Sequence, residues 1–433
     1  MTSKRIGFIT HDPSFEELLG EHPTLRLLSK EPEGKPFYHE AGLHVPSKSS
    51  VYLTTNRLLG SREVDEDGKL EQESFVIKID LDHLKPPTAE EVSAAYDNGS
   101  SSGSKVPGLL EPLEGYQRGL EALESSGQLF TSLKRDQIAM PNGGSPWTAG
   151  EVKVDRKDSS GDTVEPRILF CDQGRCSTKH DSRFISMSVE PPHETRVELG
   201  SGFQGKPFSS LNDVVFHVPS GCLFFTDPDY GVEQGFRRGD VEYAPNGVYV
   251  WSPSSGKVEL IDDRFVKPNG VTFVPSDRQD PTNPTGTLYV TDTGHFRFKP
   301  NKGLGDLIAE REGPSRIYRY RVERDEIDPK GFKVDPTSRE VFAESNVENG
   351  EGVPDGIHSD SFGNVWTGQG NGIHVHSSRG KRLGEILLPG GKGCANFCWA
   401  GVEDATGQGS KHRLLIFAED ELWEARIGVP GFD

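Results

Sequence analysis

The chain has 433 residues and a formal net charge of −19 at pH 7, which argues against nucleic acid or an anionic membrane as a partner because both favour clustered Lys and Arg. It contains no run of about 18 apolar residues that could span a bilayer, and its N-terminal stretch lacks the apolar region of a signal peptide, so a cytoplasmic location is expected. Its 50 glycines and 30 prolines fall in short turn-like groups, which favours an all-β fold of many short strands.

Three types of strand recur along the chain. The first begins beside a small polar residue, and its copies lie at 37–47, 139–155, 210–220, 267–276, 353–363 and 393–403. The second is a short apolar run that often ends in Thr-Asp or a similar pair, at 49–56, 166–174, 221–231, 286–294, 363–372 and 412–420. The third alternates apolar and polar residues, at 74–82, 183–190, 246–261, 315–323, 371–388 and 421–428. Six units of three or four antiparallel strands, each unable to bury both faces alone, predict a six-bladed β-propeller.

The propeller is expected to be a single domain over residues 1–433, with four-stranded antiparallel blades. Residues 24–30, TLRLLSK, are predicted to close the ring as the outer strand of the last blade, which removes a free sheet edge. The copies are spaced more widely than the roughly 40–50 residues of a compact blade. We therefore expect an insertion at about 83–136 between blades 1 and 2, either a lid over the channel or a surface ornament with a short amphipathic helix at 111–133. A second insertion is expected at 297–314.

The cysteines are five in number and irregularly spaced, without the paired C-x-x-C spacing of a zinc site. We interpret all of them as small hydrophobic residues of the core: Cys171, Cys176, Cys222, Cys394 and Cys398.

The first residues of the innermost strands of a propeller gather at one mouth of its central channel. Placed in one register, these heads are Glu40, Asn142, Asn212, Asn269, Asp355 and Asn396. Asn-Gly and Asp-Gly pairs are common turn formers, so backbone conformation alone could explain any one of them. Two carboxylates and four amides that converge on one axis instead predict a cage of oxygen ligands for a hard divalent cation.

Several stretches resemble a known family, namely LNDVVFHVPSGCLFFTDPDYG (211–231), KPNGVTFVPS with LYVTDTG (267–294) and VPDGIHSDSFGNVWTGQGNGIHV (353–375). They are similar to the senescence marker protein/gluconolactonase/luciferin-regenerating enzyme superfamily of calcium-dependent six-bladed propellers. The resemblance implies metal ligands at four positions: Glu40, Asn212, Asn269 and Asp355. Gluconolactonase-type relatives often carry a substrate-binding Arg shortly before the Asn-Asp motif, where this chain reads PFSSLND, so an identical sugar-lactone pocket is not implied.

The expected function is therefore a calcium-dependent hydrolase that opens a small-molecule lactone, with other divalent cations possible. The cation would polarise the carbonyl, and Asp355 would act as base or nucleophile. Asn142, His295 and Asn396 are expected to bind substrate. The alternatives are a diisopropylfluorophosphatase-like phosphotriester hydrolase, a non-catalytic ligand-binding propeller and a metal-independent strictosidine-synthase-like enzyme. The sequence indicates neither the particular lactone nor the oligomeric state.

Overall fold

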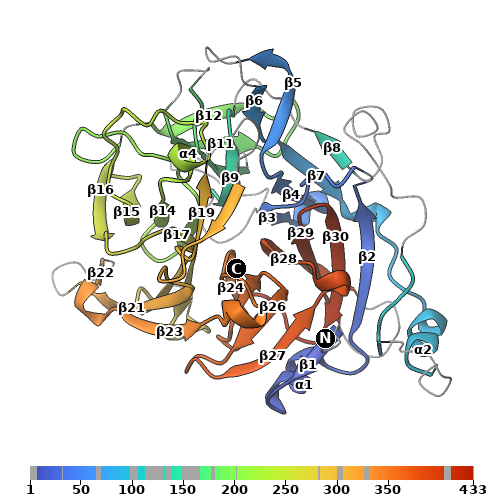
Figure 1. Ribbon diagram of the computed structural model, residues 1–433. Coiled ribbons are helices and arrows are strands. Elements are labelled where there is room, and N and C mark those ends of the chain that lie inside the picture. The colour runs from blue at the N-terminus through green and yellow to red at the C-terminus, as the bar shows by residue number, and fades with distance from the viewer. Residues whose placement is uncertain are drawn as a thin grey trace, which may run out of the picture.

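The computed structural model describes residues 7–31, 33–64, 70–97, 106–112, 130–132, 138–147, 166–176, 181–200, 202–280, 283–299, 306–325, 331–403 and 411–432. Six antiparallel sheets are arranged as blades in a ring around a central axis (Figure 1). The fold is therefore a six-bladed β-propeller, as the repeated strand pattern predicted.

The blades follow the chain order, and each begins with the strand nearest the axis. Blade one consists of β3 (Glu40–Val45), β4 (Ser50–Thr54), β7 (Val76–Asp80) and β8 (Phe130–Ser132). Blade two consists of β9 (Pro141–Pro146), β10 (Arg167–Asp172), β11 (Arg183–Ser188) and β12 (Thr195–Leu199). Blade three consists of β13 (Val214–His217), β14 (Cys222–Asp227), β15 (Gly247–Ser252) and β16 (Lys257–Asp262). Blade four consists of β17 (Pro268–Pro275), β18 (Gly286–Asp292), β21 (Arg316–Arg324), β22 (Phe332–Val334) and β23 (Glu340–Glu344). Blade five consists of β24 (Ile357–Ser359), β25 (Val365–Gln369), β26 (Gly372–His376), β27 (Arg382–Leu387) and β1 (Gly7–Thr10). Blade six consists of β28 (Asn396–Glu403), β29 (Lys411–Ala418), β30 (Glu421–Ile427) and β2 (Thr24–Lys30).

Outside the blades there are two hairpins and several short helices. The hairpins are β5 (Leu58–Val64) with β6 (Leu70–Glu73), and β19 (Phe296–Lys299) with β20 (Asp306–Ala309). The helices are α1 (Ser14–Leu19), α2 (Ala89–Asp97), α4 (Tyr230–Glu233) and the 3-10 turns η1 (Pro46–Lys48), η2 (Leu81–His83), η4 (Pro336–Ser338), η5 (Val347–Asn349) and η6 (Pro389–Gly391). Among the described residues, no helix combines the length and the apolar character needed to cross a membrane.

The hydrophobic core lies between the blades. Each of six clusters of buried apolar side chains combines residues of two neighbouring blades, for example Val51 of blade one with Leu415 of blade six, and Phe224 of blade three with Phe273 of blade four. Both faces of a blade are therefore covered only when its neighbours are present, and this interdependence is what holds the ring together.

The ring is closed by β2, which pairs antiparallel with β30 from Thr24 opposite Arg426 to Lys30 opposite Glu421. The prediction that residues 24–30 close the last blade is thus confirmed. Two blades have a fifth strand beyond the four that were predicted: β23 pairs with β21 in blade four, and β1 pairs with β27 at the outer edge of blade five. At four residues, β1 is too short to show a period of alternating polarity.

The structure corrects the position of the insertion predicted at 83–136. Because β8 pairs with β7, it is the fourth strand of blade one, and the inserted segment lies inside that blade instead of between blades one and two. The described part of the insertion packs at the periphery, where Leu110 N donates to Leu25 O of β2 and Tyr96 donates to Pro23 O. Figure 1 shows α2 on the outside of the ring, away from the channel. Most of the helix expected at 111–133 lies outside the described residues.

The cysteines were interpreted as five core thiols, and this is wrong for two of them. Cys171, Cys394 and Cys398 are buried, whereas Cys222 is half-buried and Cys176 is exposed. Cys222 is the first residue of β14, and Cys176 lies in the loop after β10, so both are at strand ends where a neighbouring blade covers them less.

Candidate functional site

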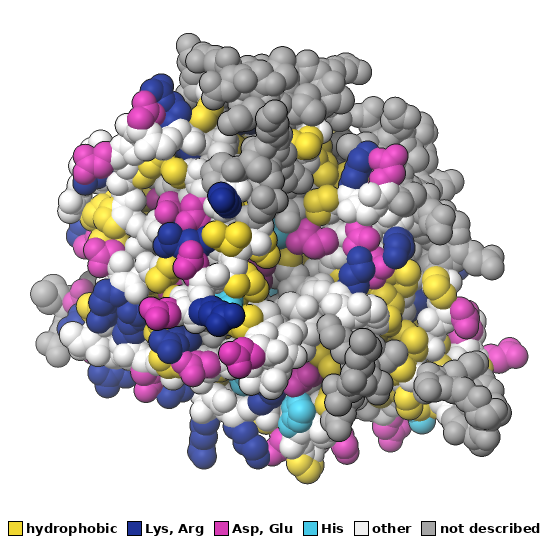
Figure 2. All heavy atoms as spheres, in the orientation of Figure 1, with side chains coloured by type: hydrophobic (Ala, Val, Ile, Leu, Met, Phe, Trp, Pro, Cys, Tyr) yellow, Lys and Arg dark blue, Asp and Glu magenta, His cyan; other side chains and the backbone are white. Residues whose placement is uncertain are grey.

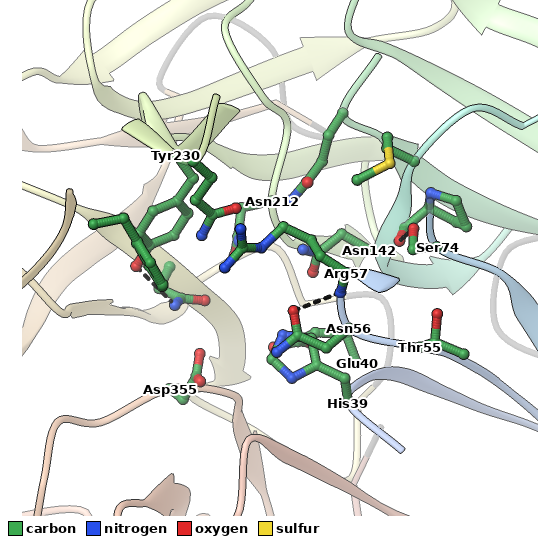
Figure 3. Close-up of a pocket in the computed structure, with 16 residues that line it drawn as sticks. His39, Glu40, Thr55, Asn56, Arg57, Ser74, Asn142, Asn212, Tyr230 and Asp355 are labelled. Atoms are coloured by element: carbon green, nitrogen blue, oxygen red, sulfur yellow. Dashed lines mark hydrogen bonds between the residues drawn. The ribbon is translucent and has the colours of Figure 1, made fainter. Parts of the chain in front are cut away.

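Five of the six predicted strand heads line one cavity of about 100 Å³ on the propeller axis: Glu40, Asn142, Asn212, Asn269 and Asp355. They come from the innermost strands of blades one to five, or from the residues just before them. Figure 3 shows Glu40, Asn142, Asn212 and Asp355 around the same space, although they are distant in the sequence.

The glycines that follow three of the heads allow neighbouring blades to approach closely at the axis. A Cβ atom on Gly143 would lie 2.6 Å from Asn212 O, one on Gly270 would lie 2.4 Å from Asp355 O, and one on Gly356 would lie 2.4 Å from Cγ of Asn396. Each glycine thus packs against the head of the next blade, which explains the Asn-Gly and Asp-Gly pairs by space and not by turn conformation.

The recurring Thr-Asp pair at the end of the second strand of a blade fixes the heads. Thr226 Oγ1 donates to Asn269 O at 2.6 Å, and Thr291 Oγ1 donates to Asp355 O at 2.9 Å, so each threonine holds the head of the next blade. The aspartate holds its own blade, since the carboxylate of Asp292 accepts hydrogen bonds from the backbone amides of Val266 and Lys267 just before β17. Threonine and aspartate together therefore set the spacing of the heads around the axis.

Of the two carboxylates of the cavity, Glu40 is buried and Asp355 is half-buried, and the two repel each other electrostatically. Burial raises the pKa of Glu40 well above its usual range, and repulsion from Asp355 adds to this effect. Burial likewise raises the pKa of Asp355 to about 7, although His39 opposes the shift. Such a pair is difficult to ionise fully unless a positive charge lies nearby.

His39 supplies part of that positive charge. Its Nδ1 lies 2.9 Å from Oε1 of Glu419. Burial alone would lower the pKa of His39, but the carboxylates of Glu419, Glu40 and Asp355 together raise it to about 9. At neutral pH the imidazole is therefore protonated and forms an ion pair with Glu419 at the edge of the cavity.

Three amide oxygens in the cavity wall have no hydrogen-bond donor. Oδ1 of Asn142, Asn212 and Asn269 are each buried without a partner among the residues that the structure describes. A buried polar oxygen without a donor is unfavourable by about 1–3 kcal/mol, and such groups are rare in folded proteins. Three of them in one cavity, beside two carboxylates, form an acceptor-rich wall.

Asn396, the sixth head, lies beside Glu40 and is not among the residues that line the cavity. Its Oδ1 accepts from Phe397 N at 2.8 Å, and its Nδ2 donates to Oε2 of Glu40 at 2.7 Å. Nε2 of His358 lies 3.0 Å from the same Oδ1 and must act as the donor, because this oxygen can only accept. A chain of hydrogen bonds thus runs from His358 through Asn396 to Glu40.

His295 was also predicted to reach the channel mouth. The structure places it half-buried at the base of the β19–β20 hairpin, where its backbone N donates to Pro314 O, and it is not among the lining residues. From the same hairpin, Phe298 does line the cavity.

The part of the cavity wall that lies outside the strand heads was not predicted from the sequence. This wall comes from the connections between the second and third strands of blades one to four, which supply Arg57, Gln173, Tyr230 and Phe298. Tyr230 accepts a hydrogen bond from Nδ2 of Asn269 at 3.2 Å (Figure 3). These connections differ in length and lack a shared motif, so no register could have identified the residues.

The surface around the mouth carries mixed charge. Figure 2 shows described Lys and Arg side chains interspersed with Asp and Glu on this face. Among the described residues, no group of three or more His, Cys, Asp or Glu side chains is arranged to hold a metal ion. The groups at the axis that could act as metal ligands are instead two carboxylates and three amides. The molecule is therefore a six-bladed propeller with a cluster of potential oxygen ligands at its centre.

Comparisons with known proteins show similarity to lactone-hydrolysing enzymes. Residues 314–406 match the family described as SMP-30/Gluconolactonase/LRE-like region. The chain is 28% identical over 257 residues to a gluconolactonase of Zymomonas mobilis subsp. mobilis, an alignment that covers 59% of this chain and 60% of that protein, less than two thirds of its length. It is 25% identical over 440 residues to lactonohydrolase oryH of Aspergillus oryzae, covering 96% of this chain and 79% of that protein.

Among solved structures, a gluconolactonase from Xanthomonas campestris superposes with a TM-score of 0.54 at 18% sequence identity, over 98% of this chain and 94% of that chain. This likeness supports the propeller fold. The family match over residues 314–406 includes the motif at 353–375, one of the stretches in which the sequence showed a resemblance to this family.

Proposed function

We propose that the protein is a metal-dependent hydrolase that opens lactones, with calcium as the metal ion. The observation that carries this proposal is the set of three buried amide oxygens, at Asn142, Asn212 and Asn269, that find no donor within the described part of the chain. Hard divalent cations prefer carboxylate and amide oxygens, so a bound cation would satisfy Asn212 and Asn269 and balance the charge of the two carboxylates. The relatives named gluconolactonase and lactonohydrolase support the choice of a lactone as substrate.

The residues present fit the ion. Glu40, Asn212, Asn269 and Asp355 would hold it, and Asn142 would complete the wall or contact the substrate. When bound, a divalent cation supplies a Lewis acid that polarises the lactone carbonyl and stabilises the negative charge formed on attack.

Asp355 is the carboxylate that we assign to the activation of water. Glu40 is fully buried and engaged by Asn396 at 2.7 Å, whereas Asp355 is only half-buried and faces the cavity. Asp355 takes a proton from the attacking water, the water oxygen bonds to the carbonyl carbon, and the proton passes to the ring oxygen as the C–O bond breaks. The product is the open hydroxy acid.

The proposal is tested by metal analysis of the purified protein together with a panel of aldonolactones and aromatic lactones, assayed with and without a chelator. We expect a bound divalent cation and lactone opening that the chelator abolishes and calcium restores. Asn269→Ala should reduce calcium affinity at least tenfold, because one ligand oxygen is lost, whereas Asn349→Ala on the exposed surface should leave it unchanged. Lactone opening that persists without any metal would contradict the proposal.

A further inference from the structure

Arg57 places a positive charge inside the axial cavity. It lies in the connection between β4 and β5, lines the cavity, and has only 8% of its surface exposed. Burial lowers the pKa of its guanidinium to about 10, an effect that Glu419 opposes, so the group is still charged at neutral pH. A guanidinium presents its donors in a planar fork that matches the two oxygens of a carboxylate.

The arginine side chain is held in place from three different blades. Oε1 of Gln72, in the hairpin of blade one, accepts from Nη1 of Arg57 at 3.1 Å, while Oδ1 of Asn56 accepts from the backbone N of Arg57 at 2.7 Å and so fixes its main chain. Gln72 is itself oriented by Gln234 of blade three, whose backbone O accepts from Nε2 at 2.7 Å. Phe298 of blade four lies against the guanidinium, with Cζ of Arg57 4.8 Å from the ring centroid. The guanidinium is therefore oriented before any ligand arrives.

Arg57 and the strand heads reach the same small space from different parts of the fold, the connection after β4 and the innermost strands. In Figure 3 the Arg57 side chain points toward Tyr230, and Asp355 lies across the open space from it. A lactone whose carbonyl points toward the strand heads would therefore turn its far end toward Arg57. Arg57 would therefore discriminate between lactones by the chemical group at that far end.

We propose that the lactone opened at this site carries a carboxylate substituent and that Arg57 binds this carboxylate. The inference rests on the proposed function, because it concerns the substrate of the same site. It assigns Arg57 to substrate selection, and Gln72 and Phe298 to the positioning of its guanidinium.

The test uses a matched pair of lactones with the same ring, 5-oxotetrahydrofuran-2-carboxylate and its carboxamide, which differ in charge and little in shape. The wild-type protein with calcium should favour the carboxylate in kcat/KM by about ten- to a hundredfold, the range of a hydrogen bond to a charged group. Arg57→Gln should abolish this preference, mainly through KM, and Arg57→Lys should retain part of it. The matched control is Arg297→Gln, which removes an arginine that is 47% exposed on the β19–β20 hairpin and should leave the preference unchanged.

Binding of the open product, 2-hydroxyglutarate, is measured by calorimetry on the same variants. Weaker binding to Arg57→Gln than to the wild type and to Arg297→Gln supports the inference. An equal preference for both lactones in the wild type, or a preference that survives in Arg57→Gln, overturns it while leaving the lactonase proposal intact. If the wild type opens neither lactone, calorimetry decides the inference: binding that depends on Arg57 supports it, and binding that is unaltered or absent overturns it.

Discussion

The hydrogen bond between Asn396 and Glu40 should set the affinity of the axial site for its cation. Replacing Asn396 by Ala removes the donor that holds Oε2 of Glu40 at 2.7 Å, and both residues are at most 2% exposed. A buried hydrogen bond to a charged group contributes about 1.5–3 kcal/mol, and the loss of a partner that orients a metal ligand typically lowers affinity about 10–100-fold. We therefore expect Asn396→Ala to weaken calcium binding by one to two orders of magnitude.

The assay is calorimetric titration of the metal-free protein with calcium, with circular dichroism to confirm that each variant is folded. His358 provides the internal control, because it donates to Asn396 Oδ1 at 3.0 Å and Asn396 in turn donates to Glu40. His358→Gln retains a donor and should bind calcium nearly as the wild type does, whereas His358→Leu should lie between the wild type and Asn396→Ala. If Asn396→Ala raises KM for the lactone and leaves calcium affinity unaltered, Asn396 binds substrate as the sequence predicted, and the reasoning from its hydrogen bonds is refuted.

Two further predictions concern stability. Glu424 is 1% exposed and contacts three arginines, Arg26, Arg413 and Arg426, at 2.9, 3.0 and 3.0 Å, so Glu424→Gln should lower the free energy of unfolding by about 3–5 kcal/mol. The control is Glu344→Gln in the exposed pair with Arg316, which should change the free energy of unfolding by less than about 1 kcal/mol. Equal losses for the two variants in denaturant titrations would contradict this prediction. Burial lowers the pKa of His217 to about 4. Between pH 6.5 and pH 4 the imidazole is therefore neutral in the folded protein, whereas the unfolded chain binds a proton there. The free energy of unfolding should consequently fall as the pH drops from 6.5 to 4. His217→Phe should remove up to about 3 kcal/mol of that dependence, and a pH profile of unfolding that is unchanged in the variant would show the interpretation to be wrong.

The blades and their heads could be predicted because the chain repeats them. An apolar strand with a small polar residue before it is ambiguous once, but the same pattern six times has few architectures that accommodate it. The reason for the Thr-Asp pairs was not visible in the sequence. It lies in contacts between blades, such as Thr226 to the backbone of Asn269, which join residues of adjacent repeats.

The position of Asn396 shows the limit of reasoning from register. Its place in the sequence is equivalent to that of the other heads, yet its amide group contacts Glu40 and Phe397 N instead of facing the cavity. A difference of this kind depends on the rotation of a side chain about its own bonds, and the strand pattern fixes only where the Cα atom lies. The role of Asn142, whose Oδ1 does face the cavity, stays a prediction.

The two halves of the site depend on different parts of the chain. The acceptor wall comes from the innermost strands, whose spacing is set by hydrogen bonds between blades and by glycines that leave no room for a side chain. Arg57 and Phe298 come from the connections between the second and third strands of blades one and four, which can change in length or sequence without altering the ring. Substitution in these connections can therefore alter which molecule is bound while the strand heads keep their geometry. This separation explains why the repeated motifs predicted which heads meet at the axis, whereas the residues that would select a substrate could not be predicted.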